Sequence, residues 1–289
     1  MFHRLSYLFA ISVFAITSCS DDEIRGTQKV RIDLSVDIDD TYTQTRSSKS
    51  HFTKGDVIGF YLVNYKNNYP GKVGTANNFM NVEYMFDGNS WDNVDGDNAY
   101  LDDATMMADA YVYHPFDYEM SRSFNKMDLS AFPFSVKQNQ ASGLQKSDFL
   151  WGKYTQVSIS DPGARVTFRH LLSKIVIHVS ADVVEDFPVM IHNLENSCTI
   201  DMNDGKLTLI NGKISEIKPF TENISDEGYS RTYGSIVVPQ TIKIGTPLFS
   251  IIRNDGTMLV YHIDHDLHME QGKAYIFNLL IGKAKKGNL

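Results

Sequence analysis

The stretch KVRIDLSVDID, residues 29–39, decides how the chain begins its fold, because apolar and polar side chains alternate along it without a break. The apolar set is Val30, Ile32, Leu34, Val36 and Ile38. Successive side chains of a β-strand point to opposite faces, so the pattern predicts a half-buried strand. Burying its apolar face contributes on the order of 7 to 15 kcal/mol before conformational entropy is subtracted. We therefore expect this strand to be an integral part of a sheet, and its removal to leave an apolar groove with unpaired backbone.

The rest of the chain has the same strand-forming character. Helical periodicity is nearly absent, while short alternating or β-branched runs recur between turn-forming residues. Hairpin signals include NDGK at residues 203–206 and NDGT at residues 254–257. Many short strands with polar turns predict an all-β protein built from antiparallel β-sandwiches. The break at Pro162 and Gly163 predicts two of them in tandem, at residues 28–161 and 164–289.

Residues 1–18 have the layout of a secretory signal peptide, with Arg4 near the start, an apolar run and then small residues. The apolar run is too short for a membrane span, which needs about 20 residues. Residues 16–19, ITSC, resemble the lipobox of bacterial lipoproteins. The resemblance implies that Cys19 is the first mature residue and carries a lipid that anchors the protein in the outer membrane. The alternative is an ordinary signal peptide that contains a cysteine.

Acidic residues follow Cys19 at once, in a linker that covers residues 19–27. They look like the surface-export signal of Bacteroidetes lipoproteins, which implies that the protein faces the cell exterior. The alternative is a soluble acidic spacer.

Charge and cysteine content argue against two classes of protein, those that bind nucleic acid and those that disulfides stabilise. The net charge of −8 argues against nucleic acid as a partner, because a phosphate-binding surface needs clustered Lys and Arg. Cys198 is the only cysteine besides Cys19. If Cys19 carries lipid, Cys198 is unpaired, so stability must come from a packed core rather than from disulfides.

Six segments resemble the fimbrillin-like family in order and rough spacing, and the resemblance extends over nearly the whole mature chain. They are FTKGDVIGFYLV, ADAYVYHPF, QNQASGLQKSDFLWGK, VTFRHLLSKIVIHV, IVVPQTIKIGTPLFSI and MEQGKAYIFNLLIG. The resemblance implies two transthyretin-like β-sandwich domains, in a lipoprotein that builds, caps or anchors type V pili. Such a protein has other pilus subunits as partners and a place in the fimbrium once processed.

The polar link after the first strand, DDTYTQTRSSKS, contains one arginine, Arg46. Exposed polar loops are preferred sites of proteolysis. The family resemblance implies that an arginine-specific protease cuts here and frees the strand that carries Val30 to Ile38. A neighbouring subunit then donates its own strand to the groove, which is β-strand addition. The alternative is that Arg46 lies in an ordinary uncut loop.

The C-terminal end departs from the pattern of a stalk subunit, which needs a spare apolar strand to donate. The last predicted strand, AYIFNLLIG, is expected to belong to the second sheet, and KAKKGNL after it has little apolar surface. This favours a tip or accessory subunit.

Signals for catalysis, cofactors and metals are weak. The chain has no G-x-S-x-G, P-loop or H-E-x-x-H motif, so we expect neither an enzyme nor a cofactor. On a strand, His262 and His268 would lie about 20 Å apart and His265 would face the other way, which argues against a metal site. The acidic region 87–103 lacks the EF-hand spacing for calcium.

Aromatic residues such as Trp91, Tyr111, Tyr113, Phe116 and Trp151 could stack on sugars, although core packing explains them as well. The alternative function is therefore a stand-alone glycan-binding surface lipoprotein of a nutrient-uptake system, with a ligand on a host or bacterial surface.

Overall fold

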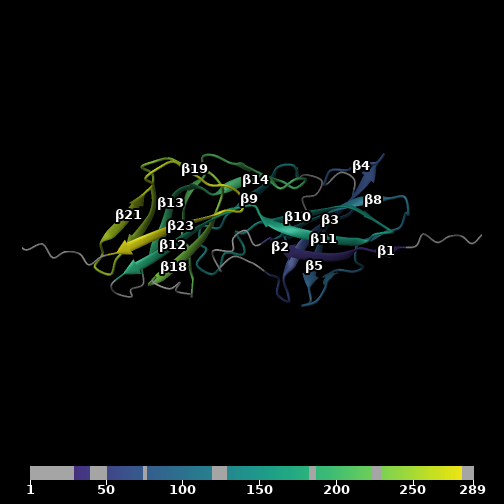
Figure 1. Cartoon of the computed structure of the whole chain (residues 1–289), viewed down its shortest axis with the longest axis horizontal. Coiled ribbons are helices and arrows are strands. Elements are labelled where there is room, and N and C mark those ends of the chain that lie inside the picture. The colour runs from purple at the N-terminus through teal and green to yellow at the C-terminus, as the bar shows by residue number, and fades with distance from the viewer. Residues whose placement is uncertain are drawn as a thin grey trace, which may run out of the picture.

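The computed structural model describes residues 29–39, 51–73, 77–118, 129–181, 187–222 and 229–281. Strands dominate these residues, which confirms the predicted all-β class. The strands gather in two halves that lie end to end along the long axis of the molecule (Figure 1). Among the described residues, no helix is long and apolar enough to cross a bilayer.

The first half is built around one eight-stranded sheet with the order β2-β11-β10-β8-β3-β5-β6, in which β4 also pairs with β3. A short pair, β1 with β7, lies beside it. The bounds of these strands are β1 (Val30–Arg31), β2 (Asp33–Ile38), β3 (Val57–Lys66), β4 (Tyr69–Pro70), β5 (Asn77–Phe86), β6 (Trp91–Asn93), β7 (Tyr100–Leu101), β8 (Met107–His114), β10 (Leu150–Ser158) and β11 (Gly163–His170).

Both faces of the central strand β3 are buried, which explains its nearly continuous apolar run, VIGFYLV. Ile58, Phe60 and Leu62 face one core, while Tyr61 and Val63 face the other. Gly59 is opposite Tyr113 in the ladder, and the tyrosine ring occupies the place where a Cβ would lie. A larger residue at position 59 would therefore displace the ring.

The second half is a sandwich of two four-stranded sheets, β17-β18-β12-β23 and β16-β13-β20-β21, with short pairs around them. Ile175 and Ile177 of one sheet and Ile191 and Phe249 of the other belong to one buried core. The free Cys198 lies in that core too. The bounds are β12 (Ser173–Ala181), β13 (Val189–Glu195), β14 (Ser197–Asp201), β15 (Lys206–Leu209), β16 (Ile214–Ile217), β17 (Phe220–Glu222), β18 (Arg231–Val237), β19 (Thr241–Ile242), β20 (Pro247–Ile252), β21 (Met258–His262), β22 (Leu267–His268) and β23 (Ala274–Ile281).

Two strand pairs differ from the antiparallel expectation. Strand β2 runs parallel to β11, and β23 runs parallel to β12. Each of these two strands lies at the end of its sheet's strand order.

Strand β11 lies beyond the predicted boundary at Pro162, yet it pairs with β10 and β2 of the first sheet. Pro162 lies between β10 and β11, next to the turn in which the amides and carbonyls of Ser158 and Asp161 bond to each other at 3.1 Å. The chain leaves the first half for the last time at Leu171 and Leu172, which are buried in the core that the second half contains.

Residues 129–149 also cross the predicted boundary, since they pack on the second half although they precede β10. Strand β9 (Phe132–Ser135) pairs with β14. The buried side chain of Gln140 donates to the carbonyl oxygen of Ile236 at 2.8 Å and accepts from its amide at 2.9 Å. We call residues 129–149 the crossover segment. Sequence breaks alone could not reveal it, because its partners lie far along the chain.

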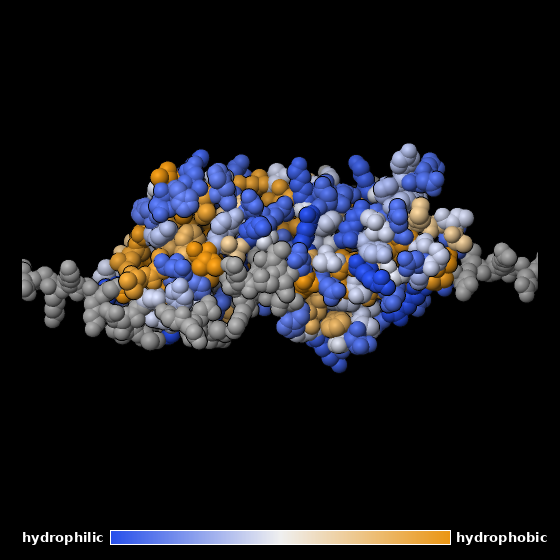
Figure 2. All heavy atoms as spheres, viewed as in Figure 1, coloured by the Kyte–Doolittle hydropathy of each residue, from blue (hydrophilic) through white to orange (hydrophobic). Residues whose placement is uncertain are grey.

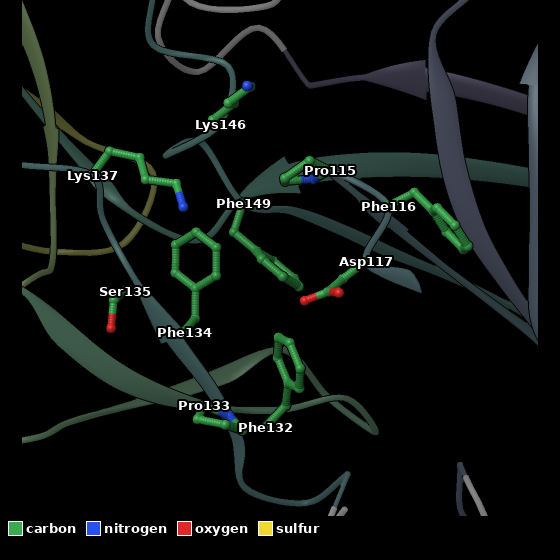
Figure 3. Close-up of a pocket in the computed structure, with 10 residues that line it drawn as sticks. All are labelled: Pro115, Phe116, Asp117, Phe132, Pro133, Phe134, Ser135, Lys137, Lys146 and Phe149. Carbon is green, nitrogen blue, oxygen red and sulfur yellow. The ribbon is translucent and has the colours of Figure 1, made fainter. Parts of the chain in front are cut away.

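The crossover segment and the end of β8 enclose a cavity at the junction of the two halves, lined by aromatic and charged side chains (Figure 3). A different, apolar surface lies at the far end of the second half, over β21 and β23 (Figure 2). Its exposed side chains include Met258, Leu259, Val260, Ile276 and Leu280.

Candidate strand-exchange site

The N-terminal strand, residues 30–38, comprises β1 and β2 and has the predicted alternation. Ile32, Leu34 and Val36 are buried, and Val30 and Ile38 are partly buried. The charged and polar residues between them are exposed. The apolar face completes a core that contains Phe60, Tyr84, Val112, Leu150, Val166 and Phe168. Removing the strand would therefore expose apolar side chains of this core.

One side of β2 is bound to β11 in a parallel ladder that runs from the pair Asp33 and Gly163 to the pair Ile38 and Phe168. The amide of Asp33 donates to the carbonyl oxygen of Pro162 at 3.0 Å, and the amide of Asp39 donates to that of Phe168 at 2.7 Å. Because β2 lies at the end of the strand order, its release breaks a single long ladder.

The start of the same strand pairs with β7, which lies outside the eight-stranded sheet. Val30 is opposite Leu101 and Arg31 is opposite Tyr100. The amide of Ile32 adds a hydrogen bond of 2.8 Å to the carbonyl oxygen of Ala99. The N-terminal strand therefore bridges β7 and β11 and closes the first half around its core.

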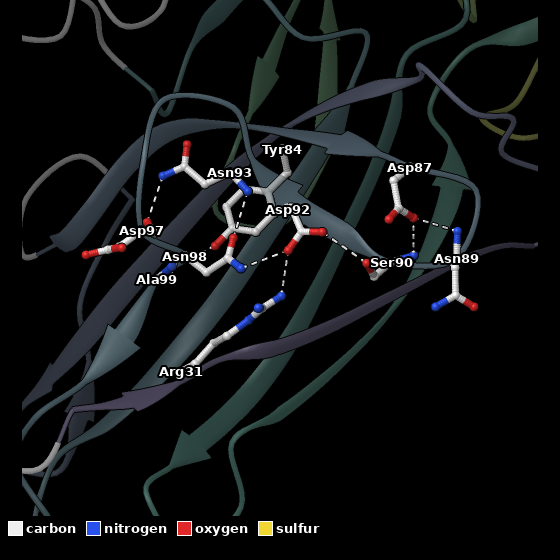
Figure 4. A network of polar contacts seen from close by, with 10 residues as sticks. All are labelled: Arg31, Tyr84, Asp87, Asn89, Ser90, Asp92, Asn93, Asp97, Asn98 and Ala99. Atoms are coloured by element: carbon white, nitrogen blue, oxygen red, sulfur yellow. Dashed lines mark hydrogen bonds and ion pairs between the residues drawn. The ribbon is translucent and has the colours of Figure 1, made fainter.

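A polar network holds the loop that follows β6 against this strand (Figure 4). Arg31 forms an ion pair with Asp92 at 2.8 Å, and Asp92 also accepts hydrogen bonds from Asn98 and Ser90 at 3.0 Å. These bonds, with the Arg31 guanidinium, lower the pKa of Asp92 below its usual value. About half of each charged side chain is exposed, so the pair contributes little to stability by itself.

The loop is fixed to the sheet at a second point. The hydroxyl of Tyr84 accepts the amide proton of Ala99 at 2.7 Å, and Asn98 accepts that of Asn93 at 2.7 Å. Asp87 accepts from the amides of Asn89 and Ser90 in a tight turn. The sequence raised calcium binding as one possibility for this acidic region. It did not reveal that the region holds the loop after β6 to the N-terminal strand. The repeated Asn and Asp pattern, typical of turns, was the available signal.

The other predicted site residues are distributed as follows. Cys19 and Arg46 lie outside the described residues. His262, His265 and His268 bond separately to Gly245, Asp264 and Thr241. In the part of the chain that the structure describes, no three His, Cys, Asp or Glu residues are grouped as metal ligands.

Four of the aromatics that sequence reasoning considered for sugar stacking are core residues. Trp91, Tyr111, Tyr113 and Trp151 are buried. Phe116 is partly buried and lines the junction cavity. Burial keeps the first four rings from offering a surface to a sugar.

Comparison with known proteins gives both a family and a fold. The family model described as fimbrillin-like matches residues 45–289. A crystal structure of a candidate cell adhesion protein from Bacteroides uniformis aligns with a TM-score of 0.66 at 18% identity, over 88% of this chain and 94% of that one. Another such protein, from Bacteroides ovatus, aligns with a TM-score of 0.68 at 15% identity, over 88% and 92%.

A fimbrial protein from Bacteroides vulgatus aligns with a TM-score of 0.50 at 14% identity, over 89% of this chain and 96% of that one. At these identities the likeness shows the fold. No curated protein matches the chain.

Proposed function

Because this chain belongs to the fimbrillin-like family, we propose that it is a cell-surface lipoprotein that serves as a structural or adhesive component of type V pili. Its lipid on Cys19 anchors it in the outer membrane, facing the exterior. Its partners are other pilus subunits, which it binds by β-strand addition after cleavage near Arg46.

The observation that carries this proposal is the N-terminal strand, which closes an apolar core from the edge of a sheet. An edge strand can be replaced by another extended segment, because the backbone groups of β11 and the apolar groove accept any strand with the same alternation. Exchange therefore needs no rearrangement of the rest of the first half.

Arg46 is well placed in the sequence for such a cut. It follows soon after Asp39, the residue whose amide makes the last hydrogen bond of the ladder. A cut there leaves residues 19–46 attached only by noncovalent contacts, and the lipid departs with them. Arg31, by contrast, is held in a paired strand and an ion pair.

The C-terminal strand supports a tip or accessory position rather than a stalk position. Strand β23 pairs with β12 from Ala274 to Ile281. Tyr275, Phe277 and Leu279 pack against the second core, and Ile281 is part of it. Donating β23 to another subunit would expose that core, so the chain is better suited to accept a strand than to give one.

The test is the N-terminal residue of protein recovered from cells and from fibres. We expect Cys19 in the anchored form and a new start after Arg46 in the assembled form. Arg46→Ala and Arg46→Lys should both block cutting and incorporation, whereas Arg25→Ala, in the acidic linker, should leave both intact. Normal incorporation of either Arg46 variant would contradict the proposal.

The second candidate function is a stand-alone glycan-binding surface lipoprotein, which the aromatic cavity at the junction favours. In that case Cys19 remains the N-terminal residue in every preparation. The two candidates are thus separated by the same measurement.

A further inference from the structure

The junction cavity has the size of a small-molecule site. Its volume is about 430 Å³, within the range that ligand pockets occupy. It lies between the residues that follow β8, strand β9 and the turn before β10, so the crossover segment provides most of its wall. It is separate from the N-terminal strand, whose side chains are absent from its lining.

Three phenylalanines form an apolar wall on one side of the cavity (Figure 3). Phe149 is buried and stacks on Tyr113, with ring centres 5.8 Å apart and planes 13° apart. Phe134 meets Phe149 edge to face at 5.1 Å, and Phe132 lies 6.1 Å from it. These contacts fix the rings in place before any ligand arrives, which lowers the entropy cost of binding.

Opposite charges face the cavity from two sides. The Lys137 ammonium extends toward the Phe134 ring, and the Asp117 carboxylate points between Phe132 and Phe149 (Figure 3). Lys146 lies at the rim with its ammonium directed outward (Figure 3). Neither lysine forms an ion pair with any residue that the structure describes, so the positive side is open to an anionic group.

The backbones that carry Lys137 and Asp117 are both held rigidly. The amide of Lys137 donates to the hydroxyl of Ser147 at 2.9 Å, and its carbonyl oxygen accepts from Gln140 at 3.0 Å. The amide of Asp117 donates to the hydroxyl of Tyr113 at 3.2 Å, and its carbonyl oxygen accepts from Asn81 at 3.0 Å. The charged groups are therefore presented at fixed points on either side of the aromatic wall.

We propose that this cavity binds an acidic sugar residue, a uronic acid within a polysaccharide chain. The C–H face of the sugar ring lies on Phe134, the one of the three phenylalanines that is only partly buried, because weakly positive C–H groups are attracted to the negative face of an aromatic ring. The sugar carboxylate pairs with Lys137, and Lys146 receives the next acidic unit at the rim. Asp117 accepts hydrogen bonds from the ring hydroxyls.

Other ligand classes match these groups less well. A neutral sugar or an apolar side chain leaves Lys137 without an acceptor. A phosphate or sulfate has no apolar face to match the aromatic rings. The inference rests on the adhesive part of the proposed function and names the class of its ligand.

The experiment is isothermal titration calorimetry of the purified protein, with its N-terminal strand in place, against tetragalacturonate. Galactotetraose provides a neutral sugar of equal length, and a tetraglutamate peptide provides equal charge without sugar. We expect tetragalacturonate to bind at least tenfold more tightly than either. Equal affinity for the neutral sugar, or for the peptide, would overturn the proposal.

Variants connect the binding to the cavity. Lys137→Ala and Phe134→Ala should each weaken binding at least tenfold, while Lys137→Arg keeps most of it. Lys66→Ala is the matched control, because Lys66 is an exposed lysine at the end of β3, beside β4. Unchanged thermal unfolding of Lys137→Ala shows that the loss is local. If Lys137→Ala binds tetragalacturonate as tightly as Lys66→Ala does, the ligand does not bind in the junction cavity and the proposal is overturned. Such a failure leaves strand exchange untouched, since that is tested by cutting at Arg46.

Discussion

Ile32 and Asp33 are neighbours in the chain, yet their amides bind separate parts of the first half, one beside β7 and the other beside β11. The amide of Ile32 donates to Ala99 at 2.8 Å, whereas that of Asp33 donates to Pro162 at 3.0 Å. Adjacent amides of an extended strand point in opposite directions, so at this point the N-terminal strand is bound on both sides. The strand closes the first half, and its loss would open two edges and one apolar core.

The buried face of this strand should dominate its contribution to stability. Leu34→Ala removes side-chain volume from the core and should lower the free energy of unfolding by about 2 to 5 kcal/mol. Ser35→Ala, at the next and exposed position, should change it by less than about 0.5 kcal/mol. Urea unfolding measures both. Equal effects of the two substitutions would show that the strand is not packed as described.

Cutting after Arg46 in purified protein should weaken the hold on the N-terminal strand and expose apolar surface. We expect a lower melting temperature, dye binding to exposed apolar surface and a tendency to aggregate. Adding excess peptide KVRIDLSVDID should reverse these changes. Two control peptides should reverse these changes poorly. One is the same peptide with Leu34→Asp, and the other is AYIFNLLIGKAKKGNL. Cut protein that melts like the intact form would contradict this account.

The contribution of the polar network around Asp92 to the stability of the fold should depend on pH. Because its pKa is lowered in the folded protein, the ionised carboxylate stabilises the fold above its unfolded pKa of about 4. That contribution disappears as the pH falls through the lower, folded pKa. Asp92→Asn should therefore be less stable than the wild type at pH 7, by less than about 1 kcal/mol for so exposed a group. The gap should close as the pH falls below the lowered pKa that Asp92 has in the folded protein. A gap that stays constant as the pH is lowered would rule out the ionised carboxylate as the cause.

Lipid attachment at Cys19 predicts the fate of the Cys19→Ala protein. Without the thiol, the chain should remain unprocessed or lose its membrane association. Membrane fractionation with intact mass analysis of wild type and variant measures this. Cys198→Ala serves as the matched control, because Cys198 is a buried core residue. A Cys19→Ala protein with wild-type size and membrane association would remove the lipoprotein interpretation.

The buried side chain of Gln140 should help to hold the crossover segment on the second half, in addition to the ladder of β9 with β14. Gln140→Ala leaves the amide and the carbonyl of Ile236 without the partners they have in a buried site. The expected loss is about 1 to 3 kcal/mol for such buried polar groups. Gln138→Ala, at an exposed position, should have a small effect. A loss for Gln138→Ala as large as that for Gln140→Ala would contradict the assignment.

Sequence reasoning succeeded where the determinants are local. The alternation of Ile32, Leu34 and Val36 is written in consecutive residues, so the strand and its buried face could be predicted. Its partner could not, because the parallel ladder to β11 joins segments more than a hundred residues apart. Pro162 was interpreted as a linker for the same reason: a turn inside one sheet and a break between two domains have similar local sequences.

The junction cavity could not be predicted from the sequence for a similar reason. Phe116 was noted as one aromatic among several, but its companions Phe132, Phe134 and Phe149 come from the crossover segment. Only the pairing of β9 with β14 brings that segment to the junction. Nothing in the local sequence distinguishes Lys137 and Lys146 from other lysines, and only the fold places both beside the same wall.

The path of the crossover segment has a mechanical consequence. From β8 to β9, from β9 back to β10, and from β11 to β12, the backbone passes between the halves three times. A pulling force along the long axis is then shared by several covalent connections and by the antiparallel ladder of β9 with β14, instead of falling on a single connection. The threading of the chain therefore makes the two halves resist stretching as one unit.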